Sequence, residues 1–248
     1  MRFDVITLFP QVFTSITEHG ISSRALHRGL WTIHTWNPRD VTSDLHRTID
    51  DRPFGGGPGM VMMADPLARC VDLIRKSGNT GPVVAFAPGG KVLDDALVKS
   101  WSTDANASFI FVCGRYEGID ERFLQTYVDV TISLGDFVLS GAELPAAVCI
   151  DALVRQLPGA LKELSVEDES FRTGLLDAPH YTRPEVWRDM AVPEVLLSGH
   201  HANIEHWTRE ATLKATFQKR PDLIKIARSR GRLSPADEAF LKSLENAS

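Results

Sequence analysis

Three stretches of small residues each follow a short apolar run, and together they suggest a site for a small ligand. Val83–Ala87 leads into Pro88-Gly89-Gly90, Phe109–Cys113 into Gly114–Arg122, and Val128–Ile132 into Ser133–Pro145. In open parallel sheets, ligands bind where the carboxyl ends of the strands meet. Loops of small residues beside apolar side chains suit a nucleoside held by backbone hydrogen bonds, with simple loop closure as the alternative interpretation.

The densest glycine cluster is Arg52–Met60, where backbone amides could approach a phosphate or a base. No Gly-Lys-Ser/Thr follows it, which excludes a P-loop, and no Gly-x-Gly-x-x-Gly follows a strand. A flexible turn is therefore the alternative. The histidines His200, His201 and His206 have no acidic residue at a known ligand spacing, so no metal site is predicted.

The distribution of charge matters more than its sum. The formal net charge of −5 disfavours a nucleic-acid partner, but residues 209–232 hold eight basic residues and two acidic ones. A local surplus of this size can neutralise backbone phosphates. From charge alone, a solvated helical face is the favoured interpretation of this cluster.

The first two-thirds of the chain alternate strands with helices, which predicts an α/β fold with a mainly parallel sheet covered on both faces. The expected strands are Arg2–Leu8, Trp31–Trp36, Val83–Ala87, Phe109–Cys113 and Val128–Ile132. Three expected helices begin at aspartates that can cap them, Asp65, Asp94 and Asp120. A longer helix is expected over Glu143–Leu157, ended by Pro158-Gly159.

The pattern changes after Gly159. Residues 160–175 are acidic with weak periodicity, which is typical of a linker or a lid. Residues 176–248 are expected to form a small helical domain, with helix starts at Pro221 and Ser234. Its first long helix carries an apolar stripe of Ile204, Trp207, Ala211 and Ala215. The chain is thus divided into domains 1–159 and 176–248, joined by the linker 160–175.

The composition is that of a globular protein, with 248 residues of which 43% are hydrophobic and 24% charged. No run of about 18 uncharged apolar residues occurs, and the early acid Asp4 argues against a secretory signal. Cys70, Cys113 and Cys149 lie in apolar runs without Cys-x-x-Cys spacing, which is typical of buried thiols in a reducing compartment. We therefore expect a cytoplasmic protein with no membrane partner.

Six motifs, which run through nearly the whole chain, resemble those of the bacterial tRNA (guanine-N1-)-methyltransferase family. They are Thr7–Pro10, Asp50–Met60, Cys113–Arg122, Gly135–Gly141, Gly174–Pro184 and Leu196–His201. The resemblance implies a fold of the SPOUT class with a deep trefoil knot, an exception to the general absence of threaded chains. It also implies a homodimer that methylates N1 of guanosine 37 in tRNA, with S-adenosylmethionine as the methyl donor. The sequence does not predict a requirement for Mg²⁺.

The same resemblance, carried over position by position, implies roles for individual residues. The donor would be held by Phe86, Ala87, Pro88, Gly114, Tyr116, Glu117, Leu134, Gly135, Asp136, Phe137, Val138, Leu139, Gly141 and Pro145. Arg155 matches the arginine that faces O6 of the guanine, and Glu169 falls at the position of the general base. The RNA-binding candidates are Gly59, Arg183, Arg209, Lys214, Lys219 and Arg220.

The chain departs from the family pattern at the base. The family has aspartate before Ser-Phe, whereas here Glu169 stands in register and Asp168 precedes it, so either carboxylate could be the base. Two other functions are kept as alternatives: a related knotted methyltransferase acting elsewhere on RNA, and a non-catalytic RNA-binding protein on the same fold. The second would be expected to lack Arg155 or the acidic pair, and this chain has both.

Overall fold

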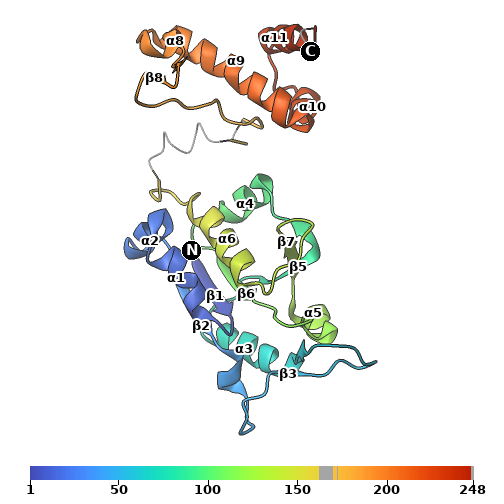
Figure 1. Ribbon diagram of the computed structural model, residues 1–248. Helices are drawn as coiled ribbons and strands as arrows, with labels where there is room; N and C mark the ends of the chain where they lie inside the picture. Colours follow the sequence, from blue (N-terminus) through green and yellow to red (C-terminus); the bar gives the residue numbers. More distant parts are fainter. Residues whose placement is uncertain (162–169, 172, 247–248) are drawn as a thin grey trace. The chain divides into compact units, whose positions relative to one another are not determined.

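The computed structural model describes residues 1–161, 170–171 and 173–246, and the chain divides into two compact units, 1–163 and 164–248. Figure 1 shows the N-terminal unit in blue to yellow and the C-terminal unit in orange to red. Of the expected linker 160–175, residues 162–169 and 172 lie outside the described part of the chain.

The N-terminal unit is built on a five-stranded sheet in which all neighbouring strands run parallel. Its spatial order is β2-β1-β6-β5-β7. The strands are β1 (Arg2–Ile6), β2 (Thr32–Trp36), β5 (Val83–Val92), β6 (Ser108–Val112) and β7 (Val130–Ser133). The predicted parallel α/β sheet is thus confirmed, and β5, β6 and β7, which precede the three loops of small residues, are neighbours.

Strand β5 runs further than its sequence predicts. Pro88-Gly89-Gly90 reads as a turn, but in the structure β5 pairs with β7 both before and after an irregularity between Phe86 and Lys91. The turn residues therefore form a local bulge, and pairing resumes after it. This bulge lies at the carboxyl end of the sheet, where it separates the first half of β5 from its continuation.

Side chains that alternate along the strands fill two separate cores, one on each face of the sheet. On β6, Phe109 and Phe111 belong to one core, and Ile110 and Val112 belong to the other. The first face is covered by α1 (Thr14–Thr17), α2 (Gly20–His27), α4 (Asp95–Ser102) and α6 (Glu143–Val154). The second is covered by α3 (Ala64–Lys76) and α5 (Glu121–Tyr127).

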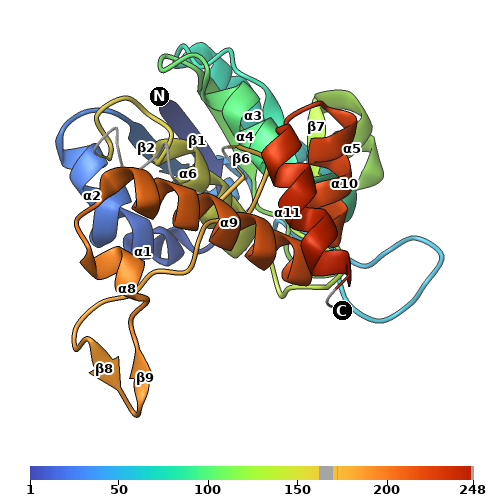
Figure 2. The same ribbon diagram turned by 90° about the horizontal axis from the view of Figure 1, so that it is seen from above.

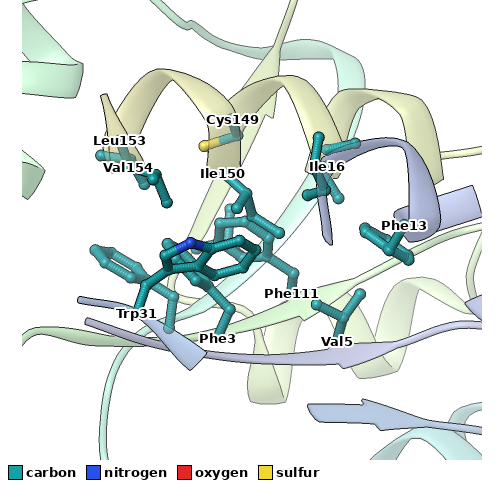
Figure 3. Close-up of a cluster of buried hydrophobic side chains, with 14 of the residues drawn as sticks. Phe3, Val5, Phe13, Ile16, Trp31, Phe111, Cys149, Ile150, Leu153 and Val154 are labelled. Atoms are coloured by element: carbon teal, nitrogen blue, oxygen red, sulfur yellow. The ribbon is translucent and has the colours of Figure 1, made fainter. Parts of the chain in front are cut away.

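Helix α6 packs its aliphatic side chains on a group of aromatic rings over the sheet. Figure 3 shows Ile150 and its neighbours on α6 directed toward Phe3 and Phe111 on the strands, with the Trp31 ring among them. The Phe3 ring centroid lies 5.9 Å from that of Trp31 and 5.5 Å from that of Phe111. Such ring pairs each add about 0.5–1.5 kcal/mol beyond the area they bury. Ile150, Leu153 and Val154 of α6 belong to the same buried cluster, so these rings form the surface on which α6 packs.

Two of the three predicted aspartate caps are confirmed. The Asp94 carboxylate accepts a hydrogen bond from the Leu97 amide at 2.8 Å, and Asp120 accepts one from the Arg122 amide at 2.9 Å. The predicted cap at Asp65 is wrong, because α3 begins at Ala64, two residues before the predicted start at Pro66, and Asp65 lies in its first turn. There it pairs with Arg69, one turn further along, at 2.9 Å.

Helix α6 ends at Val154, three residues before the predicted end at Leu157. The amides of Gln156 and Leu157 each bond to a carbonyl three residues back, at 3.1 and 3.0 Å, and so form a tight turn. The residue before a proline avoids the helical conformation, and Pro158 follows directly. Arg155 is consequently the C-cap of α6 and not one of its interior residues.

Shorter elements frame the glycine cluster. The antiparallel pair β3 (Asp50–Asp51) and β4 (Val61–Met62) brackets residues 52–60. Two short 3-10 helices, η1 (Pro10–Phe13) and η2 (Pro38–Val41), follow β1 and β2. The glycine cluster is therefore the loop that connects the two short strands β3 and β4.

Three helices form the core of the C-terminal unit. They are α9 (His201–Lys219), α10 (Pro221–Ser229) and α11 (Pro235–Asn246), which confirms the helix starts expected at Pro221 and Ser234. Ser234 and Asp237 cap α11 reciprocally, each side chain accepting the other's amide at 3.2 and 2.8 Å. The predicted stripe of Ile204, Trp207, Ala211 and Ala215 is half-buried. The fully buried residues of α9 are Leu213 and Thr216, and Leu213 packs with Ile224 and Leu241.

The expectation of helices throughout 176–248 is also wrong for its first part. A hairpin of β8 (Val186–Trp187) and β9 (Met190–Ala191) precedes the short helix α8 (Glu194–Leu197). Arg188 and Asp189 form its two-residue turn with φ of 48° and 63°. Figure 2 shows this hairpin extending away from α8. Its turn carries no glycine, so the usual sequence signal was absent.

The cysteines behave as predicted from their apolar surroundings. Cys70, Cys113 and Cys149 are all buried and unpaired with one another. Burial raises the pKa of Cys70 and of Cys149 to about 12, which keeps both thiols protonated. Among the described residues, no helix is both long and apolar enough to cross a bilayer.

Candidate active site

A cavity of about 360 Å³ lies at the carboxyl ends of β5, β6 and β7. Its wall is formed by the bulge of β5, the loop 114–119 after β6, the loop 134–141 after β7, and the first turn of α6. Cavities that hold small ligands typically range from about 300 to 1,000 Å³. The three loops of small residues therefore form one site, as their positions after strands predict.

The cavity brings together all but one of the residues assigned to the donor. Those that line it are Phe86, Ala87, Pro88, Gly114, Tyr116, Glu117, Leu134, Gly135, Phe137, Val138, Leu139, Gly141 and Pro145. Asp136 belongs to the same loop but does not line the cavity. The lining mixes apolar side chains with the backbone of glycine-containing loops, which is the surface that an apolar base and a polar sugar need.

The loop after β6 is held in place by the last residue of the glycine cluster and by Met62, which follows it. The Glu117 amide donates to the Met60 carbonyl, the Met62 amide to the Gly118 carbonyl, and the Asp120 amide to the Met62 carbonyl, each at 2.9 Å. These bonds form a short ladder between the two segments. The glycine cluster is thus connected directly to one wall of the cavity.

An ion pair joins the loop after β6 to the start of α6. Glu143, in the first turn of α6, has a side chain only 1% exposed, and its Oε2 lies 2.8 Å from Nε of Arg115. The two atoms form an ion pair without an aligned hydrogen bond, since neither has a hydrogen-bond partner. Glu143 Oε1 accepts a hydrogen bond of 2.9 Å from the Thr7 hydroxyl at the end of β1.

The environment of this pair is apolar. Burial raises the pKa of the adjacent Cys113 thiol well above its usual value; the Glu143 carboxylate acts in the same direction and Arg115 opposes it. A buried carboxylate is costly unless it is paired and hydrogen-bonded. Glu143 meets that condition through Arg115 and Thr7, and the start of α6 adds a favourable helix dipole.

Arg155, the one residue matched to catalysis that the structure describes, does not line the cavity. Arg155 caps the C-terminus of α6, whereas Pro145 in the first turn of the same helix lines the cavity. At 1.5 Å per residue, the two ends of α6 are separated by about 18 Å. Asp168 and Glu169, the two candidate bases, lie outside the described residues.

The RNA-binding candidates fall into two groups. Arg209 forms two hydrogen bonds of 2.9 and 2.8 Å to the nearly buried Asp237, and Arg220 forms two of 2.9 and 2.7 Å to Asp222. Lys214, Lys219, Arg183 and Gly59 are exposed. Arg209 therefore has a structural role in the C-terminal unit, and the lysines of α9 are the better placed for phosphates.

Sequence reasoning missed Arg115 and Glu143. Arg115 stands inside a matched motif but was not singled out, and Glu143 appeared only as the start of a helix. Nothing in the sequence links them, because α5 and β7 separate them along the chain. A weak signal was present, since an acidic residue in the first turn of an otherwise apolar helix must find a cationic or hydrogen-bonding partner once buried.

Comparison with known proteins extends over nearly the whole chain. Residues 1–226 match the family model described as tRNA (Guanine-1)-methyltransferase TrmD. A tRNA (guanine-N(1)-)-methyltransferase of Bordetella pertussis is 52% identical, with 98% of each chain covered. Proteins of the same name from Janthinobacterium sp. (strain Marseille) and Herminiimonas arsenicoxydans are 52% and 53% identical, with 98% of this chain and all of theirs covered.

Proposed function

Because this chain belongs to the tRNA (guanine-1)-methyltransferase family, we propose that it transfers a methyl group from S-adenosylmethionine to N1 of guanosine 37 in tRNA. The chain is an enzyme, and its reaction is methylation of guanine N1 in tRNA. The alternative of a non-catalytic RNA-binding protein is thereby set aside. A tRNA substrate also supports the cytoplasmic location expected from the sequence.

The observation that carries the proposal is the cavity at the carboxyl ends of β5, β6 and β7. Its size suits a nucleoside-containing ligand. Its wall is close-fitting, because a Cβ on Gly114 would lie 3.3 Å from the Ile119 side chain. S-adenosylmethionine supplies an electrophilic methyl group on its sulfonium. Phe86, Leu139 and Pro145 would pack on the donor, while the backbone of 114–117 and 134–141 would bond to its polar groups.

The chemistry at the guanine requires a base and a cation. N1 carries a proton at neutral pH, and its removal places negative charge on O6. In this proposal Glu169 or Asp168 takes the proton, and the Arg155 guanidinium stabilises the charge on O6. A carboxylate with a reference pKa of about 4 is a weak base for this step unless it is desolvated. The guanosine must also leave its stack to reach the site.

A second copy of the chain would complete the site. The predominantly apolar helix α6 leaves Leu144 56% and Val148 50% exposed, one turn apart on one face. An isologous contact through this face, with the two α6 helices antiparallel, would bring Arg155 of one protomer to the cavity end of its partner. This homodimer would account for the position of Arg155, which lies about 15 Å along α6 from Pro145 in the cavity lining of its own chain.

The trefoil knot belongs to the same proposal. The segment from β7 to α6 passes beside the loop after β6, where the Ala142 amide donates to the Gly114 carbonyl at 3.1 Å. The bulge of β5 and this segment enclose the cavity together. Both features support a threaded SPOUT-type arrangement of the loops.

The proposed function is tested with methyl-labelled S-adenosylmethionine and an unmodified tRNA that carries guanosines at positions 36 and 37. We expect one methyl group per tRNA, at N1 of guanosine 37. Replacing guanosine 37 should abolish labelling. Label that persists after this replacement would overturn the assigned position, and no label with either RNA would overturn the function.

A further inference from the structure

We propose that Arg115 and Glu143 act as one positioning unit that holds the donor cavity in its binding geometry. The inference rests on the proposed function, since it assumes that the cavity of loops 114–119 and 134–141 receives the methyl donor. Arg115 is not assigned a contact with either substrate. It acts through the loop after β7, which it fixes against the loop after β6.

The Arg115 side chain spans two walls of the cavity. It leaves the loop after β6, and its Nη1 donates to the Ser140 carbonyl in the loop after β7 at 3.2 Å. The guanidinium also packs so closely on Gly141 that a Cβ there would overlap Nε. Arg115, Ser140 and Gly141 all line the cavity. Movement of the guanidinium would therefore move one wall relative to the other.

Glu143 restricts the movement of the Arg115 guanidinium. Its buried carboxylate contacts Arg115 at 2.8 Å and also accepts the Thr7 hydroxyl at 2.9 Å, so it cannot shift without breaking one of the two. The Phe9 ring lies over the guanidinium, 4.3 Å from Cζ, and closes a further side. Arg115 thus has an ion pair, a hydrogen bond, a cation–π contact and a glycine surface that together leave one orientation.

The planar fork of arginine suits this task better than lysine does. A guanidinium offers several N–H groups in fixed directions, so it can face Glu143 and Ser140 at the same time. A lysine ammonium could retain the ion pair but would lack the rigid second donor. Substitution by lysine is therefore expected to give partial function, and substitution by methionine to give less.

The test is a double-variant cycle in which binding of S-adenosylhomocysteine to the full chain is measured by calorimetry, without RNA. We expect Arg115→Met and Glu143→Gln each to weaken binding about tenfold, the scale of one charge-assisted hydrogen bond. The affinity of the combined variant should be close to that of the single variant that binds more weakly, since the two residues act together. Arg115→Lys should fall between. KM for tRNA should stay within about twofold in all of them.

A matched control is Arg122→Met, which removes a guanidinium paired at 2.6 Å with Asp120 on the exposed start of α5. It should leave donor-analogue affinity unchanged. Glu143→Gln serves if Arg115→Met does not fold, because Glu143 does not line the cavity and can affect the donor only through Arg115.

Other results would overturn the positioning role. Arg115→Met that raises KM for tRNA while donor-analogue affinity is retained would mean that Arg115 contacts RNA itself. If the variants lower the melting temperature but leave donor-analogue affinity unchanged, the pair has only a structural role. Failure of the wild-type chain to bind S-adenosylhomocysteine would overturn the proposed function and this role with it, whereas equal binding by wild type and variants would overturn this role alone.

Discussion

Gly59 lies against the side chain of Glu117 with no room for another carbon between them. A Cβ on Gly59 would overlap the Glu117 carboxylate, and the backbone there has φ of +82°, which side-chain-bearing residues rarely adopt. Gly59 belongs to the glycine cluster and Glu117 lines the donor cavity. One residue of the cluster therefore leaves the Glu117 side chain no room on the side that faces Gly59.

Gly59→Ala is expected to displace the Glu117 side chain and to lower methyl transfer by about tenfold to a hundredfold, the range that a misplacement near 1 Å can cause. Initial rates with tRNA and saturating donor measure the effect. Gly56→Ala is a matched control, because Gly56 has a similar φ of +77° but nothing within 4 Å of its Cβ. Equal losses in both variants would attribute the effect to backbone strain and not to Glu117.

Much of the N-terminal unit could be predicted from its sequence because local patterns dominate there. The first half of β5 and most of β6 are continuous apolar runs, and Asp94 and Asp120 each mark the start of a helix. The continuation of β5 past Gly90 could not be predicted, since it depends on pairing with β7, whose residues are distant in sequence. The hairpin turn at Arg188-Asp189 could not be predicted either, because non-glycine residues adopt positive φ only when tertiary structure requires it.

The candidate site likewise has parts that local sequence predicts and parts that depend on the folded structure. Strand-end loops of small residues indicate where a ligand binds, and the resemblance supplied the identities of the lining residues. The partnership of Arg115 with Glu143 depends on three strand ends and a helix start that meet only in the folded sheet. Asp136 shows the converse limit, because it belongs to the loop after β7 and yet does not line the cavity.

The Arg209–Asp237 pair predicts a pH dependence of stability. Hydrogen bonds from Arg209 lower the pKa of Asp237 from 3.8 to about 2. A carboxyl group whose pKa is lower in the folded chain stabilises it above its unfolded pKa, and this contribution is lost as pH falls through the folded value. At neutral pH, Asp237→Asn should cost about 1.5–3 kcal/mol of unfolding free energy.

Thermal unfolding of the full chain at a series of pH values checks this. The difference in Tm between wild type and Asp237→Asn should be constant near pH 6 and shrink between about pH 4 and pH 2. Taking the difference removes the contributions of all other carboxylates. A gap that persists unchanged at pH 2 would mean that the charge of Asp237 is not what stabilises α11.

Phosphate binding is predicted to depend on the exposed lysines of α9. Lys214→Ala and Lys219→Ala should each weaken tRNA binding and lower the slope of log affinity against log salt by about one, without changing Tm. Fluorescence anisotropy with labelled tRNA at several salt concentrations measures the slope. Lys242→Ala on α11, an exposed lysine outside the basic cluster, is the control and should leave it unchanged.

Arg155 and Glu169 are predicted to serve turnover and not donor binding. Arg155→Ala and Glu169→Gln should each abolish methyl transfer, at least about a hundredfold, while S-adenosylhomocysteine affinity survives. Single-turnover rates and calorimetry separate the two effects. Full activity in Glu169→Gln together with loss in Asp168→Asn would move the base by one residue.

The last prediction concerns the two subunits. If Arg155 and the base act from different protomers, mixing Arg155→Ala chains with Glu169→Gln chains gives heterodimers with one wholly intact site and one doubly altered site. Random exchange should then recover about a quarter of wild-type activity from two inactive proteins. Mixing wild type with the Arg155→Ala/Glu169→Gln double variant is the complementary control, because each site of that heterodimer lacks one residue and should be inactive. No recovery in the first mixture, with active heterodimers in the second, would place both residues in the same chain.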